Sequence, residues 1–289
     1  MPTMIRTPSG GLAAALCLLF VWLTDSQALA QQRPLLTEDP DPVGDGRMLI
    51  EAGIDHTWAQ HFPVSGLKGN LLRSPLLGIS TGVGPSAELQ LDGLSWSRLA
   101  IHERSDAPPA PMRDPTGDST SSVEDIVVGT KLRILRETAR RPSIGLRFAT
   151  RLPTAGDEKG IGLDTMDFFQ SLLIGKSIRS TRVVANFGWA ILSDPTNGNS
   201  QNDVVSYGFS LAHRLGMLAV VADVNGWYST RRGTPPPGTD TRGTATFGLR
   251  YPIGQARLDG GYYAGVTASD HRSGVKGGVT WTFDSLLGE

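Results

Sequence analysis

The sequence predicts an all-β fold: a transmembrane, antiparallel, up-and-down β-barrel of about 12 strands behind a cleavable N-terminal signal peptide. Three observations predict it. Past residue 47, apolar and polar residues alternate in twelve short stretches. The connections between these stretches alternate between long and short, and an export signal precedes them. Alternation with a period of two gives each strand two different faces, and unequal connections indicate two rims in different compartments.

Residues 1–30 have the parts of a signal peptide that is cleaved before the mature chain begins at residue 31. Arg6 supplies the positive start, and residues 12–23 form an uninterrupted apolar run of twelve. Ala28 and Ala30 are the small residues expected at the cleavage site. Twelve apolar residues are too few to cross a bilayer as a helix, so we expect cleavage and not a membrane anchor.

Composition supports export and excludes several functions. The chain has 289 residues, of which 35 are glycine, and its formal net charge of −1 is not that of a nucleic-acid-binding protein. The single cysteine, Cys17, lies inside the apolar run of the signal peptide and follows a leucine. A lipoprotein signal has a small residue there, so no lipid anchor is expected. The mature chain then has no cysteine for a disulfide, a thiolate metal site or a nucleophile.

The mature chain divides into a lead-in segment and a barrel. Residues 31–46 are acidic, rich in proline and without periodicity, which indicates a periplasmic lead-in segment. One hypothesis is that this segment folds up into the barrel as a plug. Residues 47–289 form the barrel, with strands expected at 48–60, 71–81, 86–103, 123–135, 142–152, 164–178, 182–192, 203–214, 218–230, 241–251, 256–267 and 274–283. Gly93 could break the third strand into a hairpin, but an unbroken strand keeps the count even, and glycine can mark a bulge.

The connections predict the orientation. Short turns belong to the periplasmic rim and long loops to the exterior in barrels of this kind, which places both termini in the periplasm. The long connections are 61–70, 104–122, 153–163, 193–202, 231–240 and 268–273, and the short ones are 82–85, 136–141, 179–181, 215–217 and 252–255.

The faces of the strands distinguish this barrel from a soluble β-sandwich, which would show the same alternation. On the later strands one face carries large apolar residues such as Phe187, Phe209 and Phe247, whereas the other carries small residues and charges. A wet lumen requires such a polar face. Aromatic residues fall near strand ends, where interfacial girdles form: Trp58, Trp189, Tyr251, Trp281 and Phe283.

The alternation also predicts which charges line the lumen. An acidic sector on the first three strands is expected to face basic sectors elsewhere, and such a transverse field could select solutes. The alternative is that these charges pair across a narrow lumen and hold the wall rigid. The predicted lumen-lining residues are Glu51, Asp55, Glu88, Lys131, Arg133, Arg147, Arg250, Arg257 and Asp259, with Asp223, Asn225 and Trp227 near the outer mouth.

Catalysis is not expected. The one arrangement that resembles an outer-membrane lipid hydrolase is His271-Arg272-Ser273, in the last outer loop. Its only candidate for an orienting carboxylate is Asp284, which the predicted topology places near the opposite rim. We therefore expect no enzyme, no cofactor and no metal site.

Three short motifs resemble a known family. Residues 123–133 (VEDIVVGTKLR) resemble its strand "G-D-hydrophobic-x-hydrophobic-G-x-K-hydrophobic-R", and residues 151–156 (RLPTAG) resemble its exit "x-P-T-G" into an outer loop. Residues 186–189 (NFGW) resemble its "N-hydrophobic-G-aromatic" strand. The family is that of the outer-membrane transporters named after the meta-pathway of phenol degradation. Glu124 stands where the family usually has glycine, and Ala155 interrupts Pro-Thr-Gly.

The resemblance implies uptake of aromatic or other hydrophobic compounds. We therefore expect a porin-like channel or transporter of the bacterial outer membrane that admits small molecules passively. The alternative is a structural or partner-binding barrel with an occluded lumen. The expected partners are a small-molecule solute, the lipid and lipopolysaccharide of the outer membrane, and the barrel-assembly machinery.

Overall fold

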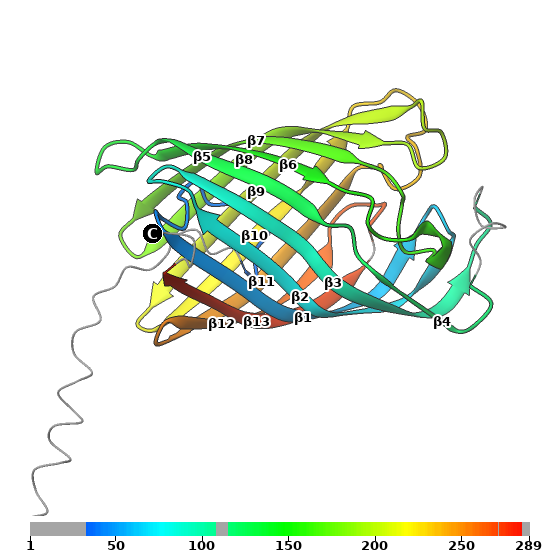
Figure 1. Ribbon diagram of the computed structural model, residues 1–289, viewed down its shortest axis with the longest axis horizontal. Helices are drawn as coiled ribbons and strands as arrows, with labels where there is room; N and C mark the ends of the chain where they lie inside the picture. The colour runs from blue at the N-terminus through cyan, green and yellow to red at the C-terminus, as the bar shows by residue number, and fades with distance from the viewer. Residues whose placement is uncertain (1–32, 108–114, 271, 285–289) are drawn as a thin grey trace, which may run out of the picture.

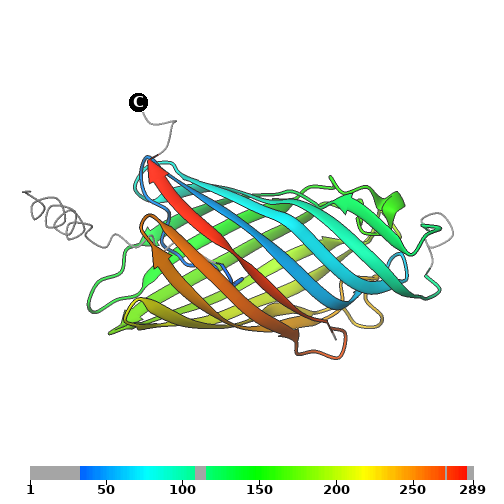
Figure 2. The ribbon, with the colours of Figure 1, turned by 90° about the horizontal axis from the view of Figure 1, so that it is seen from below.

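The computed structural model describes residues 33–107, 115–270 and 272–284, so the predicted signal peptide lies outside the described residues. The described chain forms a closed antiparallel β-barrel with strongly tilted strands (Figures 1 and 2). Its strands are β1 (Arg47–Phe62), β2 (Leu67–Gly82), β3 (Ala87–Arg104), β4 (Ser119–Val123), β5 (Val127–Leu135), β6 (Ser143–Arg151), β7 (Asp167–Ile178), β8 (Thr181–Ser193), β9 (Gln201–Leu215), β10 (Leu218–Ser229), β11 (Arg242–Ile253), β12 (Ala256–Gly265) and β13 (Ser273–Asp284).

The prediction of twelve wall positions is confirmed, although thirteen strands build them. Successive strands pair, and β1 pairs with β13 to close the ring. The two short strands β4 and β5 share one position, because β4 pairs with residues 96–100 of β3 and β5 pairs with residues 87–92. Gly93, at φ 80°, lies between these two stretches and marks an irregularity within a continuous strand, as the sequence indicated.

The predicted single strand 123–135 is therefore wrong in one respect. It is interrupted at residues 124–126, and its outer part begins earlier, at Ser119. The interruption has a physical reason, since the Glu124 carboxylate accepts hydrogen bonds from Arg73 Nε and Ser97 Oγ, both at 2.5 Å. These side chains come from β2 and β3, so Glu124 leaves the regular ladder to bond with its neighbours.

The rims differ as expected, with one exception. At one rim the connections are long, such as that between β3 and β4, residues 152–166 and residues 230–241. At the other rim residues 179–180, 216–217 and 254–255 form tight turns. The predicted long connection 61–70 is wrong, because β1 and β2 each extend over 16 residues and leave only 63–66 between them. The added part of β2 is held by apolar packing of Leu67 and Leu71 with Leu99.

The outer face of the barrel is apolar. Large side chains that the alternation placed on one face are exposed here, among them Phe187, Trp189 and Phe247, the last at 60 %. An apolar band around a closed barrel is the surface that meets lipid. In the part of the chain that the structure describes, no helix is long and apolar enough to cross a membrane.

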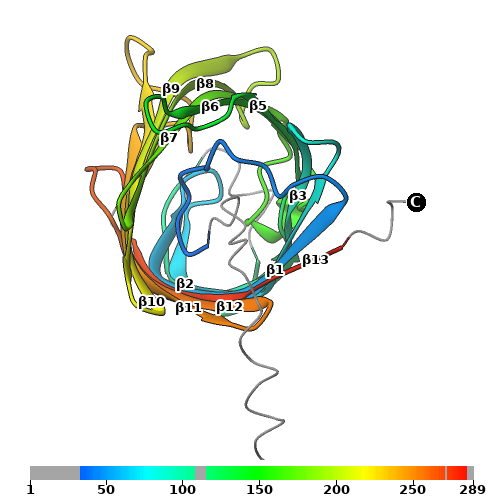
Figure 3. The same cartoon turned by 90° about the vertical axis from the view of Figure 1, so that its left-hand side faces the viewer.

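The lead-in segment lies inside the ring. Figure 3 shows residues 33–46, drawn in blue, folded within the barrel, as the plug hypothesis expects. Many of its side chains are buried, including Thr37, Glu38, Asp39 and Asp41. We call residues 33–46 the inner segment. It makes the interior of the barrel a set of contacts between this segment and the wall.

Candidate functional site

Glycines on the inner face of the wall make room for the inner segment. A Cβ added at Gly208 on β9 would lie 2.8 Å from Oγ1 of Thr37, and one at Gly248 on β11 would lie 2.8 Å from Cγ of Pro34. At Gly175 on β7 it would lie 2.9 Å from Cγ of Pro40. Side chains at these positions would occupy the space of the segment, so the glycines follow its course along the wall.

The acidic part of the inner segment lies against a group of four cations, Lys131, Arg133, Arg147 and Arg182, which we call the basic cluster. Glu38 accepts a salt bridge from Arg147 Nε at 2.9 Å and one from Lys131 Nζ at 3.4 Å. Gln90 Nε2 donates to the same carboxylate at 3.1 Å. The side chain of Lys131 is fully buried, so its charge depends on these partners for compensation.

The next two carboxylates of the segment bind one guanidinium. Arg182 donates to both oxygens of Asp39, from Nε at 2.8 Å and from Nη2 at 2.7 Å. Its Nη2 also donates to Asp41 at 2.9 Å. Asp41 accepts further bonds from Arg133 Nη1 at 3.2 Å and Ser143 Oγ at 2.8 Å. A guanidinium fork that meets a carboxylate with two bonds is strong and directional.

The first described residue of the segment, Arg33, is positively charged and lies beside carboxylates of the wall. Arg33 Nε contacts Asp259 at 3.4 Å, and its Nη2 donates to the carbonyl of Gly277 at 3.0 Å. Its own carbonyl accepts bonds from Arg250 at 2.7 Å and Arg257 at 3.0 Å. The segment is thus oriented by charge, with its cation beside carboxylates of the wall and its carboxylates beside the basic cluster.

The structure brings most of the predicted lumen-lining residues to this segment. Nine of the twelve contact it: Glu51, Glu88, Lys131, Arg133, Arg147, Asp223, Arg250, Arg257 and Asp259. Asp223 does so in the middle of β10, where it accepts bonds from Leu36 N and Thr37 Oγ1, and not at the outer mouth. Asn225 donates to Asp223 at 2.6 Å, and Trp227 donates to the carbonyl of Asp240 at 2.8 Å, in a long loop.

The three acidic residues of the first strands do not form one acidic sector. Glu88 contacts Lys131 at 3.2 Å and so belongs with the basic cluster. Asp55 contacts Arg73 at 3.6 Å and accepts a bond from the Tyr263 hydroxyl at 2.8 Å. Most lumen charges are therefore paired, either with neighbouring strands or with the inner segment, as the alternative interpretation expected.

Several residues of the site were not predicted. Arg182 shares the inward phase of Asn186, four positions further along β8, and Tyr263 shares that of Arg257 and Asp259 on β12. The period of two could have found both. Arg73 gave no such signal, because the register between β1 and β2 shifts near it.

Near the rim of long loops the interior is partly apolar. One cluster joins Leu71, Leu99 and Ile161, the last from the loop 152–166. A second joins Ala190, Leu192 and Val204, with Trp227 packed against it. The interior at this rim thus combines apolar clusters with ion pairs such as that of Arg151 with Asp167.

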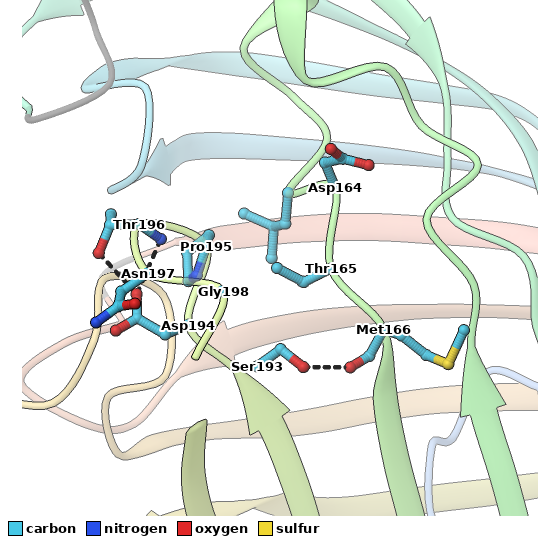
Figure 4. A pocket seen from close by; sticks show the side chains of 10 residues that line it. Asp164, Thr165, Met166, Ser193, Asp194, Pro195, Thr196, Asn197 and Gly198 are labelled. Carbon is cyan, nitrogen blue, oxygen red and sulfur yellow. Dashed lines mark hydrogen bonds between the residues drawn. The ribbon is translucent and has the colours of Figure 1, made fainter. Parts of the chain in front are cut away.

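A separate small cavity lies between two loops at the rim of long loops (Figure 4). Its volume is about 330 Å³, and residues 163–166 and 193–198 line it. Asp194 accepts bonds from Thr196 N at 2.9 Å and Thr196 Oγ1 at 2.7 Å. Burial alone would raise the pKa of Asp194, but these bonds hold it below the ordinary value. The carboxylate is thus satisfied by its own loop.

The serine and the carboxylate that the sequence offered for hydrolysis lie at opposite ends of one strand. Ser273 and Asp284 are the two ends of β13, about 35 Å apart for an extended chain. His271 lies outside the described residues. That the protein is not an enzyme stays a prediction.

A closed barrel with an apolar outer face and a polar, charged interior defines the class of outer-membrane β-barrel proteins.

No protein-family model matches the sequence, and no curated protein matches it. Among solved structures, an outer-membrane channel from Pseudomonas putida F1 is similar, with a TM-score of 0.59 and 12 % identity over 85 % of this chain and 98 % of that chain. The porin NanC has a TM-score of 0.50 and 9 % identity, with 80 % and 98 % covered. The translocator domain of the autotransporter NalP from Neisseria meningitidis has a TM-score of 0.51 and 14 % identity, with 83 % and 89 % covered. At these identities the similarity shows the fold.

Proposed function

We propose that this protein is an outer-membrane channel that admits small solutes by passive diffusion. The observation that carries the proposal is the inner segment, which fills the barrel and is held there by polar contacts. The inner segment is held by hydrogen bonds and ion pairs to a polar wall, such as Glu38 to Arg147 and Asp39 to Arg182. A barrel with a purely structural role could fill its interior with apolar side chains of the wall. Similarity to an outer-membrane channel and a porin supports this function.

We further propose that the solutes are small aromatic or other hydrophobic compounds. The apolar clusters around Leu99 and Val204, on the side of the long loops, support this class of solute. The resemblance to the phenol meta-pathway transporters points in the same direction. The solute would enter from the exterior at the long loops, and both termini would lie at the periplasmic rim, because short turns face the periplasm in such barrels.

Deletion of residues 31–46 tests the channel. The deletion removes the inner segment and leaves all strands, so single-channel conductance in planar bilayers is expected to rise several-fold over that of the full mature chain. Heat-modifiable migration in gels, which reports a folded barrel, is the control. A folded deletion variant with unchanged conductance would contradict the proposal.

The occupied interior also favours a second candidate, a partner-binding barrel whose lumen stays closed. This candidate requires that the wall and loops leave no path even without the inner segment. A folded deletion variant that carries no current would support it over the channel.

A further inference from the structure

We propose that the basic cluster is a binding site for small aromatic dicarboxylates, and that the inner segment occupies this site with its own carboxylates. The inference rests on the proposed function and names the substrate class of that channel. Glu38 takes the place of one carboxylate of a solute, and Asp39 and Asp41 together take the place of the other.

The first subsite is made by Lys131, Arg147 and Gln90, which together bind the carboxylate of Glu38 at 2.9–3.4 Å. Arg147 Nε also donates to Oε1 of Gln90 at 2.7 Å, which fixes the amide so that its NH2 group points to the carboxylate. The subsite thus combines two cations and one neutral donor around a single carboxylate, a set that selects for anions.

The second subsite is made by Arg182, Arg133 and Ser143, which bind Asp39 and Asp41 at 2.7–3.2 Å. Lys131 of the first subsite and Arg133 of the second lie two positions apart on the same face of β5, so the two subsites are neighbours on the wall. A solute that occupies both subsites therefore needs two carboxylates on one small body.

The wall itself keeps the donors in place. Lys131 contacts Glu88 at 3.2 Å, and Arg182 Nη1 contacts Glu137 at 2.5 Å. The other side of Arg182, its Nε and Nη2, is the part that binds the segment. Arg147 has the wall carboxylate of Asp92 at 3.9 Å, and Arg133 Nη2 donates to the carbonyl of Pro85 at 2.7 Å. Donors held in this way bind an anion at a smaller entropy cost than mobile ones.

The apolar clusters at the long-loop rim favour an aromatic solute, and the inner segment competes with that solute for the basic cluster. A solute that enters at the long-loop rim passes the apolar clusters there. An aromatic ring that carries the two carboxylates can bury apolar surface against these clusters, which favours its binding. The inner segment is tethered, so it competes at an effective concentration in the millimolar range. The full mature chain is expected to bind such a solute weakly, and the chain without the segment more strongly.

Phthalate is the probe, with neutral benzamide as the control solute. In the deletion variant lacking 31–46, phthalate is expected to block single-channel current with saturation, whereas benzamide at equal concentration leaves it unchanged. Arg182→Gln in the deletion variant should weaken the block about tenfold, as expected for loss of one charge-assisted pair. Arg98→Gln is the matched control, because Arg98 is exposed on the outer face of β3.

Binding is also measured by calorimetry of the same folded variants in detergent, which does not depend on current. Phthalate binding to the deletion variant that Arg182→Gln weakens and Arg98→Gln leaves intact supports the site, even in a barrel that does not conduct. Current without phthalate block or binding overturns the site and leaves the channel function standing. An equal effect of both substitutions would mean general electrostatic attraction and would also overturn the site.

Discussion

Glu137 shows how single residues anchor the wall at the rim of short turns. It lies in the turn between β5 and β6 and accepts bonds from Ser177 N at 2.8 Å and Lys176 Nζ at 3.1 Å. Arg182 reaches the same carboxylate. Burial alone would raise the pKa of Glu137, but these donors and the guanidinium hold the pKa below its ordinary 4.5. The carboxylate therefore ties β5 and β7 to the guanidinium that binds the inner segment.

Because its folded pKa is lowered, Glu137 contributes stability above its unfolded pKa and loses it as the pH falls below about 4.5 toward the folded value. We expect Glu137→Gln to lower the unfolding temperature at pH 7 and to have a smaller effect at pH 3, because the stability that the ionised carboxylate contributes decreases as the pH falls below 4.5. Heat-modifiability against temperature at both pH values measures this. Glu103→Gln is the control, since its ion pair with Lys68 is exposed. Equal destabilisation at both pH values would contradict the expectation.

Gly208 is a residue at which the wall and the inner segment can be separated experimentally. The nearest atoms to a Cβ placed there all belong to Thr37, at 2.8–3.4 Å. Gly208→Val should therefore displace the segment without disturbing the strands, and raise conductance toward that of the 31–46 deletion. Gly260→Val is the matched control, because a Cβ at Gly260 meets only a carbonyl oxygen at 3.8 Å. A change that is the same in both variants would contradict this role for Gly208.

At the scale of elements, the barrel strands follow from the sequence where one face meets lipid. Phe187, Trp189 and Ile191 are all exposed on β8, and their alternation with smaller residues defined the strand and its faces. The early strands were harder to predict, because β1 and β2 include register shifts near residues 53–55 and 57–60. A shift of one residue exchanges the faces of a strand, so period alone could not place Arg73.

The inner segment is the element that sequence could predict least. Residues 33–46 have no regular secondary structure, so neither a period of two nor one of 3.6 identifies their contacts. Composition indicated an acidic, proline-rich segment, and the wall glycines Gly208 and Gly248 showed no sign of a shared purpose in the sequence. Their function depends on a chain that lies opposite them only in the folded state. Glu88 and Lys131 could be assigned to the lumen from the sequence, but their contacts with the inner segment could not.

At the scale of the whole molecule, an apolar exterior surrounds a charged interior, which is the reverse of a water-soluble protein. The stability of such a wall depends on lipid.

Phe247, 60 % exposed, lies in the middle of β11. Phe247→Arg is expected to cost about 2–4 kcal/mol of folding free energy in lipid vesicles, measured by urea unfolding. Met217→Arg, in the turn after β9, should cost about 0–1 kcal/mol. Similar costs at the two positions would contradict a lipid-facing band around Phe247.

The contacts of Arg33 have a consequence for how the ring is completed. Every pair of neighbouring strands except β1 with β13 joins parts of the chain that lie near each other in sequence. The last joint requires the two ends of the barrel chain to meet, and its entropy cost grows with the length of the enclosed loop. Arg33 precedes β1 yet binds Asp259 on β12 and Gly277 on β13, while its amide contacts Glu51 on β1. The first residue of the inner segment therefore connects strands from both ends of the barrel chain next to this last joint, and its contacts add to the free energy that closes the ring.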